Sequence, residues 1–190
     1  MLAAMKSCPQ TESQSVLEHG ISVKNHLMDL LDHLEHGTPL KYEWKIPEWI
    51  YEEKDSILLS LPDRQTLKLY TVMHDCGKPF CLEIDEEGRR HFPNHAQVSY
   101  EAFTKFYDDP ISAELILHDM DIHVIKSEGV EEFSKTPHAI TLLISGLAEI
   151  HSNAKMFGGI DSTSFKIKHK CISKRGKQII NLTKNNQKTK

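Results

Sequence analysis

The run from Tyr70 to Pro79, YTVMHDCGKP, places an imidazole and a carboxylate on consecutive residues, His74 and Asp75. At the end of an apolar helical stretch, such a pair can converge on one divalent cation. Gly77 and Pro79 predict the end of that helix, as a glycine and a following proline commonly do. A His-Asp pair by itself is typical of a solvated surface, so the other candidate ligands matter. They lie on other predicted helices: His19, His95, His118, Asp119 and Glu149.

The first of these helices is predicted over residues 14–36. Side chains spaced by three or four positions share one face of it, namely His19, Val23, His26, Leu27, Leu30 and Leu34. His19 therefore points towards the core, where it is either a metal ligand or a hydrogen-bonded core histidine, and the other candidates favour the ligand. Residues 38–62 form an insertion in which Trp44 and Trp49 either bury apolar area or stack on a base, and burial is the favoured interpretation.

The second helix, predicted over residues 63–76, ends at the His-Asp pair. Residues 80–92 then alternate around Glu87-Gly88 and predict a short surface β-hairpin, which carries Arg89. Asn94 and Gln97 have the spacing of a capping box, which places His95 in the first turn of a third helix.

Two further helices would carry the remaining candidates. Asp109-Pro110 begins the fourth, which ends in a turn dense in polar side chains, including His118 and Asp119. Thr136-Pro137 begins the fifth, which continues to about residue 154. Glu149 there is either a ligand or a plain surface glutamate. Residues 164–180 alternate and predict a second hairpin, so the expected fold is all-α, with five or more helices and one or two small β-hairpins.

The order of these residues resembles the HD-domain superfamily of metal-dependent phosphohydrolases. EHGISV (residues 18–23) is similar to the family's first histidine, and HDCGKP (74–79) to its eponymous element. HFPNHA (91–96) resembles a stretch of the HD domains attached to tRNA nucleotidyltransferases. The resemblance covers about residues 15–155 and implies a compact helical bundle. It divides the chain into an N-terminal arm (1–13), an HD domain (14–160, with 38–62 inserted between helices) and a basic hairpin and tail (161–190).

The resemblance also implies a ligand set. One divalent ion would be held by His19, His74, Asp75 and Glu149. A second ion would be bound by His95 and His118, with Asp119 beside them, unless these histidines act on a proton instead. The family's last ligand is usually an aspartate, whereas Leu147-Ala148-Glu149 supplies a longer side chain. Alignment on Met120 would place Asp119, and not His118, in the fourth-helix position.

Roles in catalysis and substrate binding follow from the same resemblance. The implied catalytic residues are Asp75, His95 and Lys78. The implied substrate contacts are Lys78, His95, His118 and Arg89. For Lys78, contact with carbonyl groups at a helix end is an equal alternative to contact with a phosphate.

The implied cofactor is one or two divalent ions. Mixed imidazole and carboxylate ligands suit Mn, Fe, Co, Ni or Zn better than an all-oxygen Mg site, although Mg stays among the candidates. The implied reaction is hydrolysis of a phosphomonoester or phosphodiester in a nucleotide or an RNA end, of the 2′,3′-cyclic phosphate type. The alternatives are a nucleoside triphosphate or signalling-nucleotide hydrolase, or an inactive HD fold that binds nucleotides.

Composition fits a protein with a sizeable core, since the chain has 190 residues of which 39% are hydrophobic. No apolar run approaches the roughly 18 residues of a membrane span. Four cysteines without zinc-ribbon spacing and an N-terminus without a hydrophobic segment predict a reduced, cytoplasmic protein. The net charge is −4, but it is unevenly distributed. Residues 164–190 contain nine Lys or Arg and no acidic residue. Such a basic tail is either a nucleic-acid contact or a solvated end.

Overall fold

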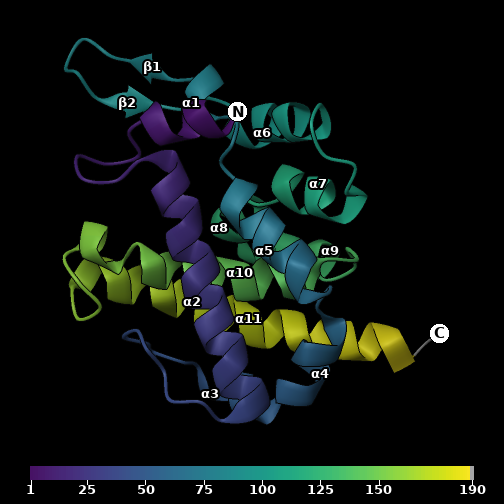
Figure 1. The fold of residues 1–190 in the computed structure, drawn as a ribbon. Coiled ribbons are helices and arrows are strands. Elements are labelled where there is room, and N and C mark those ends of the chain that lie inside the picture. Colours follow the sequence, from purple (N-terminus) through teal and green to yellow (C-terminus); the bar gives the residue numbers. More distant parts are fainter. Residues whose placement is uncertain (189–190) are drawn as a thin grey trace. The chain divides into compact units, whose positions relative to one another are not determined.

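The computed structural model describes residues 1–188. Their regular structure is helical apart from one short β-hairpin, and this confirms the predicted all-α fold (Figure 1). The helices group into two compact units, each built from two separate stretches of chain. Unit one contains residues 1–24 and 63–120, and unit two contains residues 25–62 and 121–190. The division falls within the long helix α2 (Val16–His36), which contributes its first turns to unit one and the remainder to unit two.

Unit one holds α1 (Leu2–Ser7), α5 (Arg64–Met73), α6 (His95–Thr104) and α7 (Pro110–Leu117). Helix α7 packs against both α5 and α6, and α6 and α7 lie side by side in Figure 1. The Asp63 carboxylate caps α5 by accepting from the amides of Gln65 and Thr66. As predicted, Asp109 caps α7 and Pro110 occupies its first turn.

A two-stranded antiparallel hairpin connects α5 to α6, as predicted. Strand β1 (Glu83–Ile84) pairs with β2 (Arg90–His91). The predicted capping box at the start of α6 is wrong. Asn94 takes a left-handed backbone conformation (φ 52°), and the Gln97 amide donates to Glu101 instead. A capping residue needs extended backbone angles, so the left-handed turn removes Asn94 from that role.

Unit two holds α3 (Glu48–Glu52), α4 (Lys54–Ser60), α8 (Asp121–Val124), α9 (Val130–Phe133), α10 (Ala139–Ser152) and α11 (Thr163–Lys188). The 38–62 insertion contributes α3 and α4. Trp49 is buried, and its indole N–H donates to the Ser173 carbonyl at 3.1 Å. The Trp44 indole donates to Asp29 at 3.1 Å. Trp49 is therefore buried as predicted, whereas Trp44 is half-buried.

The predicted hairpin at residues 164–180 is wrong, because this segment lies within α11, which packs against α10. Its buried residues Phe165, Ile172 and Ile179 are spaced by seven positions, as on one face of a helix. Gly176 lies on that face against Trp49, where a Cβ would come within 2.4 Å of the indole ring. Lysines between the apolar residues give a short alternating pattern like that of a strand. Over the whole segment, however, the buried apolar residues recur with the period of a helix.

Candidate metal centre

His19 occupies the second turn of α2, at a point fixed by a helix cap and a close approach of two helices. The Ser15 amide donates to Glu18 at 2.8 Å, and the Glu18 amide donates to the Ser15 hydroxyl at 3.3 Å, which forms a reciprocal capping box. Next to His19, a Cβ on Gly20 would lie 2.3 Å from the Val72 carbonyl oxygen. The absence of a side chain therefore lets α2 approach the backbone of α5. His19 is fully buried.

His74 and Asp75 lie at the end of α5, where the chain turns against α6. The Gly77 amide donates to the Ser99 hydroxyl at 2.9 Å, and a Cβ on Gly77 would lie 2.2 Å from the Ser99 nitrogen. The turn therefore packs directly on the α6 backbone. This close packing brings His95, in the first turn of α6, to the His-Asp pair.

Three imidazoles direct their Nε2 atoms at the one carboxylate of Asp75. The Nε2 atoms of His19 and His74 lie 3.6 and 3.3 Å from Oδ2, and the Nε2 of His95 lies 3.7 Å from Oδ1. Ligand atoms of His19, His74 and Asp75 all fall within 4.8 Å of one another. The three side chains are buried. They have the types and mutual spacing of a metal-binding group.

Hydrogen bonds to backbone carbonyls orient two of these rings. The Nδ1 of His74 donates to the Thr71 carbonyl at 2.8 Å, and that of His95 donates to the Phe92 carbonyl at 3.0 Å. A carbonyl oxygen only accepts, so each Nδ1 carries a proton and the neutral ring has its lone pair on Nε2. At His74 that lone pair faces a carboxylate oxygen, an arrangement that a cation shared by the two groups, either a proton or a metal ion, would stabilise. Backbone anchoring of the distal nitrogen is also what metal-ligating histidines commonly show, so these residues fit a divalent ion.

Lys78 supplies a positive charge beside the same carboxylate. Its ammonium lies 2.6 Å from Asp75 Oδ2, donates to the Gln10 side chain at 3.2 Å and lies 5.2 Å from the centre of the Phe92 ring. Burial by itself would raise the pKa of Asp75, but Lys78, and after it His74 and His19, hold that pKa well below its usual range. The pairing of the Lys78 ammonium with the Asp75 carboxylate was not predicted from the sequence.

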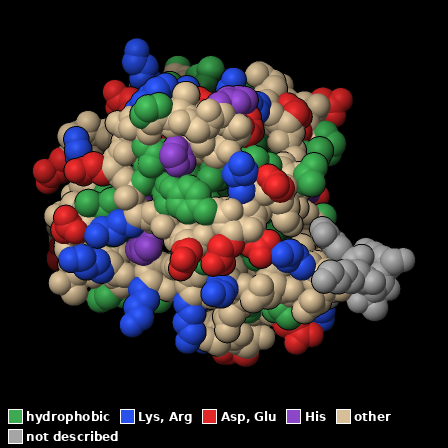
Figure 2. All heavy atoms as spheres, turned by 90° about the horizontal axis from the view of Figure 1, so that it is seen from below, with side chains coloured by type: hydrophobic (Ala, Val, Ile, Leu, Met, Phe, Trp, Pro, Cys, Tyr) green, Lys and Arg blue, Asp and Glu red, His purple; other side chains and the backbone are tan. Residues whose placement is uncertain are grey.

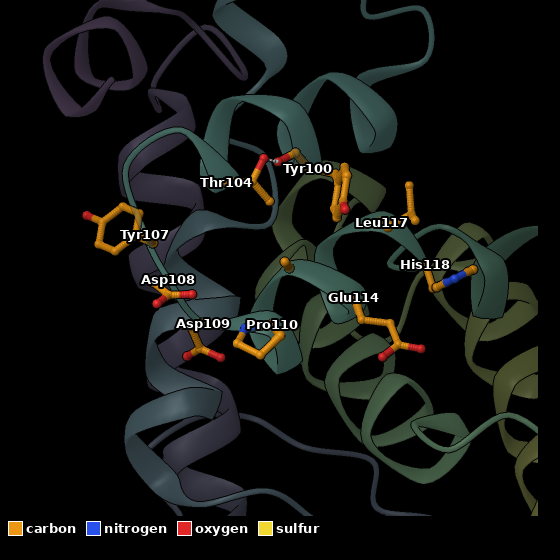
Figure 3. A pocket seen from close by; sticks show the side chains of 10 residues that line it. Tyr100, Thr104, Tyr107, Asp108, Asp109, Pro110, Glu114, Leu117 and His118 are labelled. Carbon is orange, nitrogen blue, oxygen red and sulfur yellow. Dashed lines mark hydrogen bonds between the residues drawn. The ribbon is translucent and has the colours of Figure 1, made fainter.

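The structure distinguishes the two candidates at the end of α7. Asp119 is buried, accepts a hydrogen bond from the Tyr70 hydroxyl, and has a carboxylate oxygen within 4.8 Å of a His74 ring nitrogen. His118 is exposed and lines a cavity of about 470 Å³ between α6 and α7, with Tyr100 across it and Glu114 beside it (Figure 3). Of the two adjacent side chains, Asp119 therefore joins the cluster in unit one.

Glu149 and Arg89 are the two remaining candidates. Glu149 lies in unit two on α10, where its Oε2 is 2.9 Å from the Nε2 of His123. Its role as a metal ligand stays a prediction. Arg89 pairs with Asp85 at 2.9 Å and Glu87 at 2.7 Å, both in its own hairpin. Its contact with substrate likewise stays a prediction.

Sequence reasoning also missed Gln10 and the partner role of Tyr70. For Tyr70 a signal was present, because it lies one helical turn before His74 and on the same face of α5. Nothing near Gln10 in the sequence indicates that it contacts a lysine 68 positions later.

No protein-family model, curated protein or solved structure matches this chain. The likeness to HD domains therefore rests on the motifs quoted above, and the metal centre rests on the geometry of unit one. Among residues 1–188, no helix has the length and apolar character needed to cross a membrane.

Proposed function

We propose that the protein is a metal-dependent phosphohydrolase of the HD type, which cleaves a phosphomonoester or phosphodiester in a nucleotide or an RNA end. A 2′,3′-cyclic phosphate is the preferred substrate type. The observation that carries this proposal is the convergence of three imidazole Nε2 atoms on the buried Asp75 carboxylate. The order of the motifs along the chain supports the same reaction class.

In this proposal His19, His74 and Asp75 hold the ion, and Asp119 lies beside them. A bound divalent ion lowers the pKa of a water molecule and draws charge from the phosphoryl oxygens, as phosphoester hydrolysis at neutral pH requires. Imidazole nitrogen and carboxylate oxygen together favour Mn, Fe, Co, Ni or Zn.

His95 and Lys78 have positions suited to the substrate. The side chain of His95 is 19% exposed, whereas those of His19 and His74 are at most 3% exposed, so a phosphate arriving from solvent meets His95 first. Because the His95 Nδ1–H is donated to the backbone, the Nε2 lone pair can take up a proton and pass it to a leaving oxygen. The Lys78 ammonium, beside Asp75, can donate to a phosphate oxygen.

A second candidate is a nucleotide-binding module without turnover. The observation in its favour is the 2.6 Å contact between Lys78 and Asp75, because an internal ammonium can neutralise the carboxylate without a metal ion. Nucleoside triphosphates and signalling nucleotides remain alternative substrates for an active enzyme. Metal content and turnover separate these candidates.

The decisive experiment compares the native protein with a His74→Ala/Asp75→Ala variant. Each is loaded with Mn, Co, Ni, Zn or Mg, its bound metal is quantified by mass spectrometry, and both are assayed on bis-p-nitrophenyl phosphate, 2′,3′-cyclic nucleotides and nucleoside mono-, di- and triphosphates. A His91→Ala variant is the control, because His91 is an exposed histidine of unit one that pairs with Asp85. Circular dichroism checks that all three fold.

We expect the native protein and the control to bind metal and to release product, and the double variant to do neither. Bound metal without turnover on any substrate would favour the binding module. Equal metal content in all three proteins would refute the proposed ligands. Preference for triphosphates would select the alternative hydrolase.

A further inference from the structure

One exposed face of α11 carries a row of lysines. Lys166, Lys170, Lys174 and Lys177 are separated by four, four and three positions, which places them on the same side of the helix, and all four are exposed. At 1.5 Å per residue the row extends about 16 Å along the helix axis. We call these four residues the α11 lysine row.

The row is poorly neutralised by its own helix. No Asp or Glu occurs between Ser164 and Lys190. Lys166 lies 3.9 Å from Asp161, which already binds Lys45 at 3.0 Å. Figure 2 shows several basic side chains along the lower part of the face that it displays, with acidic side chains next to them. Exposed amides also flank the row, at Gln178 and Asn181, and can donate hydrogen bonds.

The opposite face of α11 indicates which polyanion would bind. Phe165, Ile172, Ile179 and Ile180 are all buried within the protein. A helix that lies on a membrane needs such an apolar face for the lipid, so a lipid surface fits α11 poorly. A single-stranded polynucleotide offers one phosphate per nucleotide on a flexible backbone that can follow a straight row of ammonium groups.

We propose that the α11 lysine row binds the phosphate backbone of a single-stranded polynucleotide. Lysine ammonium groups are point charges that contact phosphates and do not read base edges, so this binding has no sequence preference. The inference is independent of the proposed hydrolase, because it concerns binding and needs no metal ion.

The test measures binding of the full chain to a fluorescent 20-nucleotide 2′-O-methyl oligouridylate by anisotropy, with EDTA present and at several salt concentrations. The row variant is K170Q/K174Q/K177Q, since Gln keeps the helix propensity of Lys. The control, K126Q/K135Q/K155Q, removes the same charge from exposed lysines of unit two outside α11. A K170R/K174R/K177R variant retains the charge.

We expect the row variant to bind at least about tenfold more weakly than the native protein. The slope of the logarithm of the binding constant against the logarithm of the salt concentration should fall in magnitude by about 2, because three phosphate contacts to a single strand are lost. The control and the arginine variant should bind within about twofold of the native protein. An oligothymidylate should bind like the oligouridylate.

Three outcomes would overturn the proposal. The first is no binding by the native protein at low salt. The second is an equal loss of affinity in the row variant and the control, which would show that only the net charge of the protein matters. The third is tighter binding to vesicles of phosphatidylserine, or to a duplex of the same length, than to the single strand.

Discussion

At the scale of single residues, the centre depends on groups that face one buried carboxylate. Asp75 is contacted by an ammonium and approached by three imidazoles, and its low pKa follows from those positive neighbours overcoming the effect of burial. Asp119, the second buried carboxylate of the cluster, is held by the Tyr70 hydroxyl. Lys78 and Tyr70 donate hydrogen bonds to these two carboxylates and orient them. The geometry of the centre therefore depends on these donors as well as on the ligands.

Tyr70→Phe is expected to destabilise the protein by about 1–3 kcal/mol, because the ring stays in place and the buried Asp119 carboxylate loses a donor. Metal affinity should also weaken, as when a group that orients a ligand is removed, by roughly tenfold. Urea unfolding and metal titration measure the two effects. Unchanged stability would show that Asp119 does not depend on Tyr70.

The thiols should differ sharply in reactivity. Burial, and after it the negative charge of Asp75, raises the pKa of Cys76 to about 12, whereas Cys171 on α11 is exposed. The Cys76 thiol therefore stays protonated at pH 8 and pH 10, and the thiolate is the reactive form. Mass spectrometry after iodoacetamide treatment should find Cys171 alkylated in the native protein and Cys76 only after unfolding. Alkylation of native Cys76 at pH 8 would contradict this.

At the scale of the elements, the centre is assembled by backbone close approaches. Gly20 lets α2 reach the carbonyl of Val72, and Gly77 lets the turn after α5 lie on α6. These contacts fix the distances among His19, Asp75 and His95. A side chain added at either glycine would meet backbone, which cannot move aside locally.

Gly77→Ala is therefore expected to lower the free energy of unfolding by about 3 kcal/mol, the upper part of the range for overpacking. Its Cβ would lie 2.2 Å from the Ser99 nitrogen. The matched control is Gly129→Ala, whose Cβ would meet only the side chain of Ile125 at 3.4 Å. Urea unfolding of both variants measures the effect. Similar stability of the two would mean that the turn and α6 are not in close contact.

At the scale of the whole molecule, stability should depend on pH through a buried histidine of unit two. His151 of unit two is buried; its Nδ1 donates to the Leu147 carbonyl, and its Nε2 accepts from the Lys45 amide. Burial lowers the pKa of His151 from 6.5 to about 4. The unfolded chain therefore takes up a proton between these pH values that the folded protein does not.

The stability associated with neutral His151 is fully present above pH 6.5 and is lost as the pH falls towards 4. The pKa difference corresponds to about 3 kcal/mol. His151→Gln keeps an acceptor and a donor but does not titrate. Urea unfolding from pH 7 to pH 4 should show a steeper loss for the native protein than for this variant. Parallel curves would mean that His151 is protonated in the folded state.

The sequence by itself determined the features that depend on neighbours within one or two turns. Helices α2, α5, α7 and α10 and the hairpin were predicted because spacing of apolar residues, caps and turn residues act locally. For the same reason His19 was predicted to face the core. His95 does lie in the first turn of a helix, but the capping box from which this was predicted does not form. His74, Asp75 and Asp119 were candidates from residue type and motif.

Only the tertiary structure decided which of these groups meet. The pairing of Tyr70 with Asp119 joins residues 49 positions apart, and that of Gln10 with Lys78 joins residues 68 positions apart. The contact of Gly176 with the ring of Trp49 also joins distant residues. No sequence window contains such contacts, because they arise from the burial of apolar faces and the close approach of backbones.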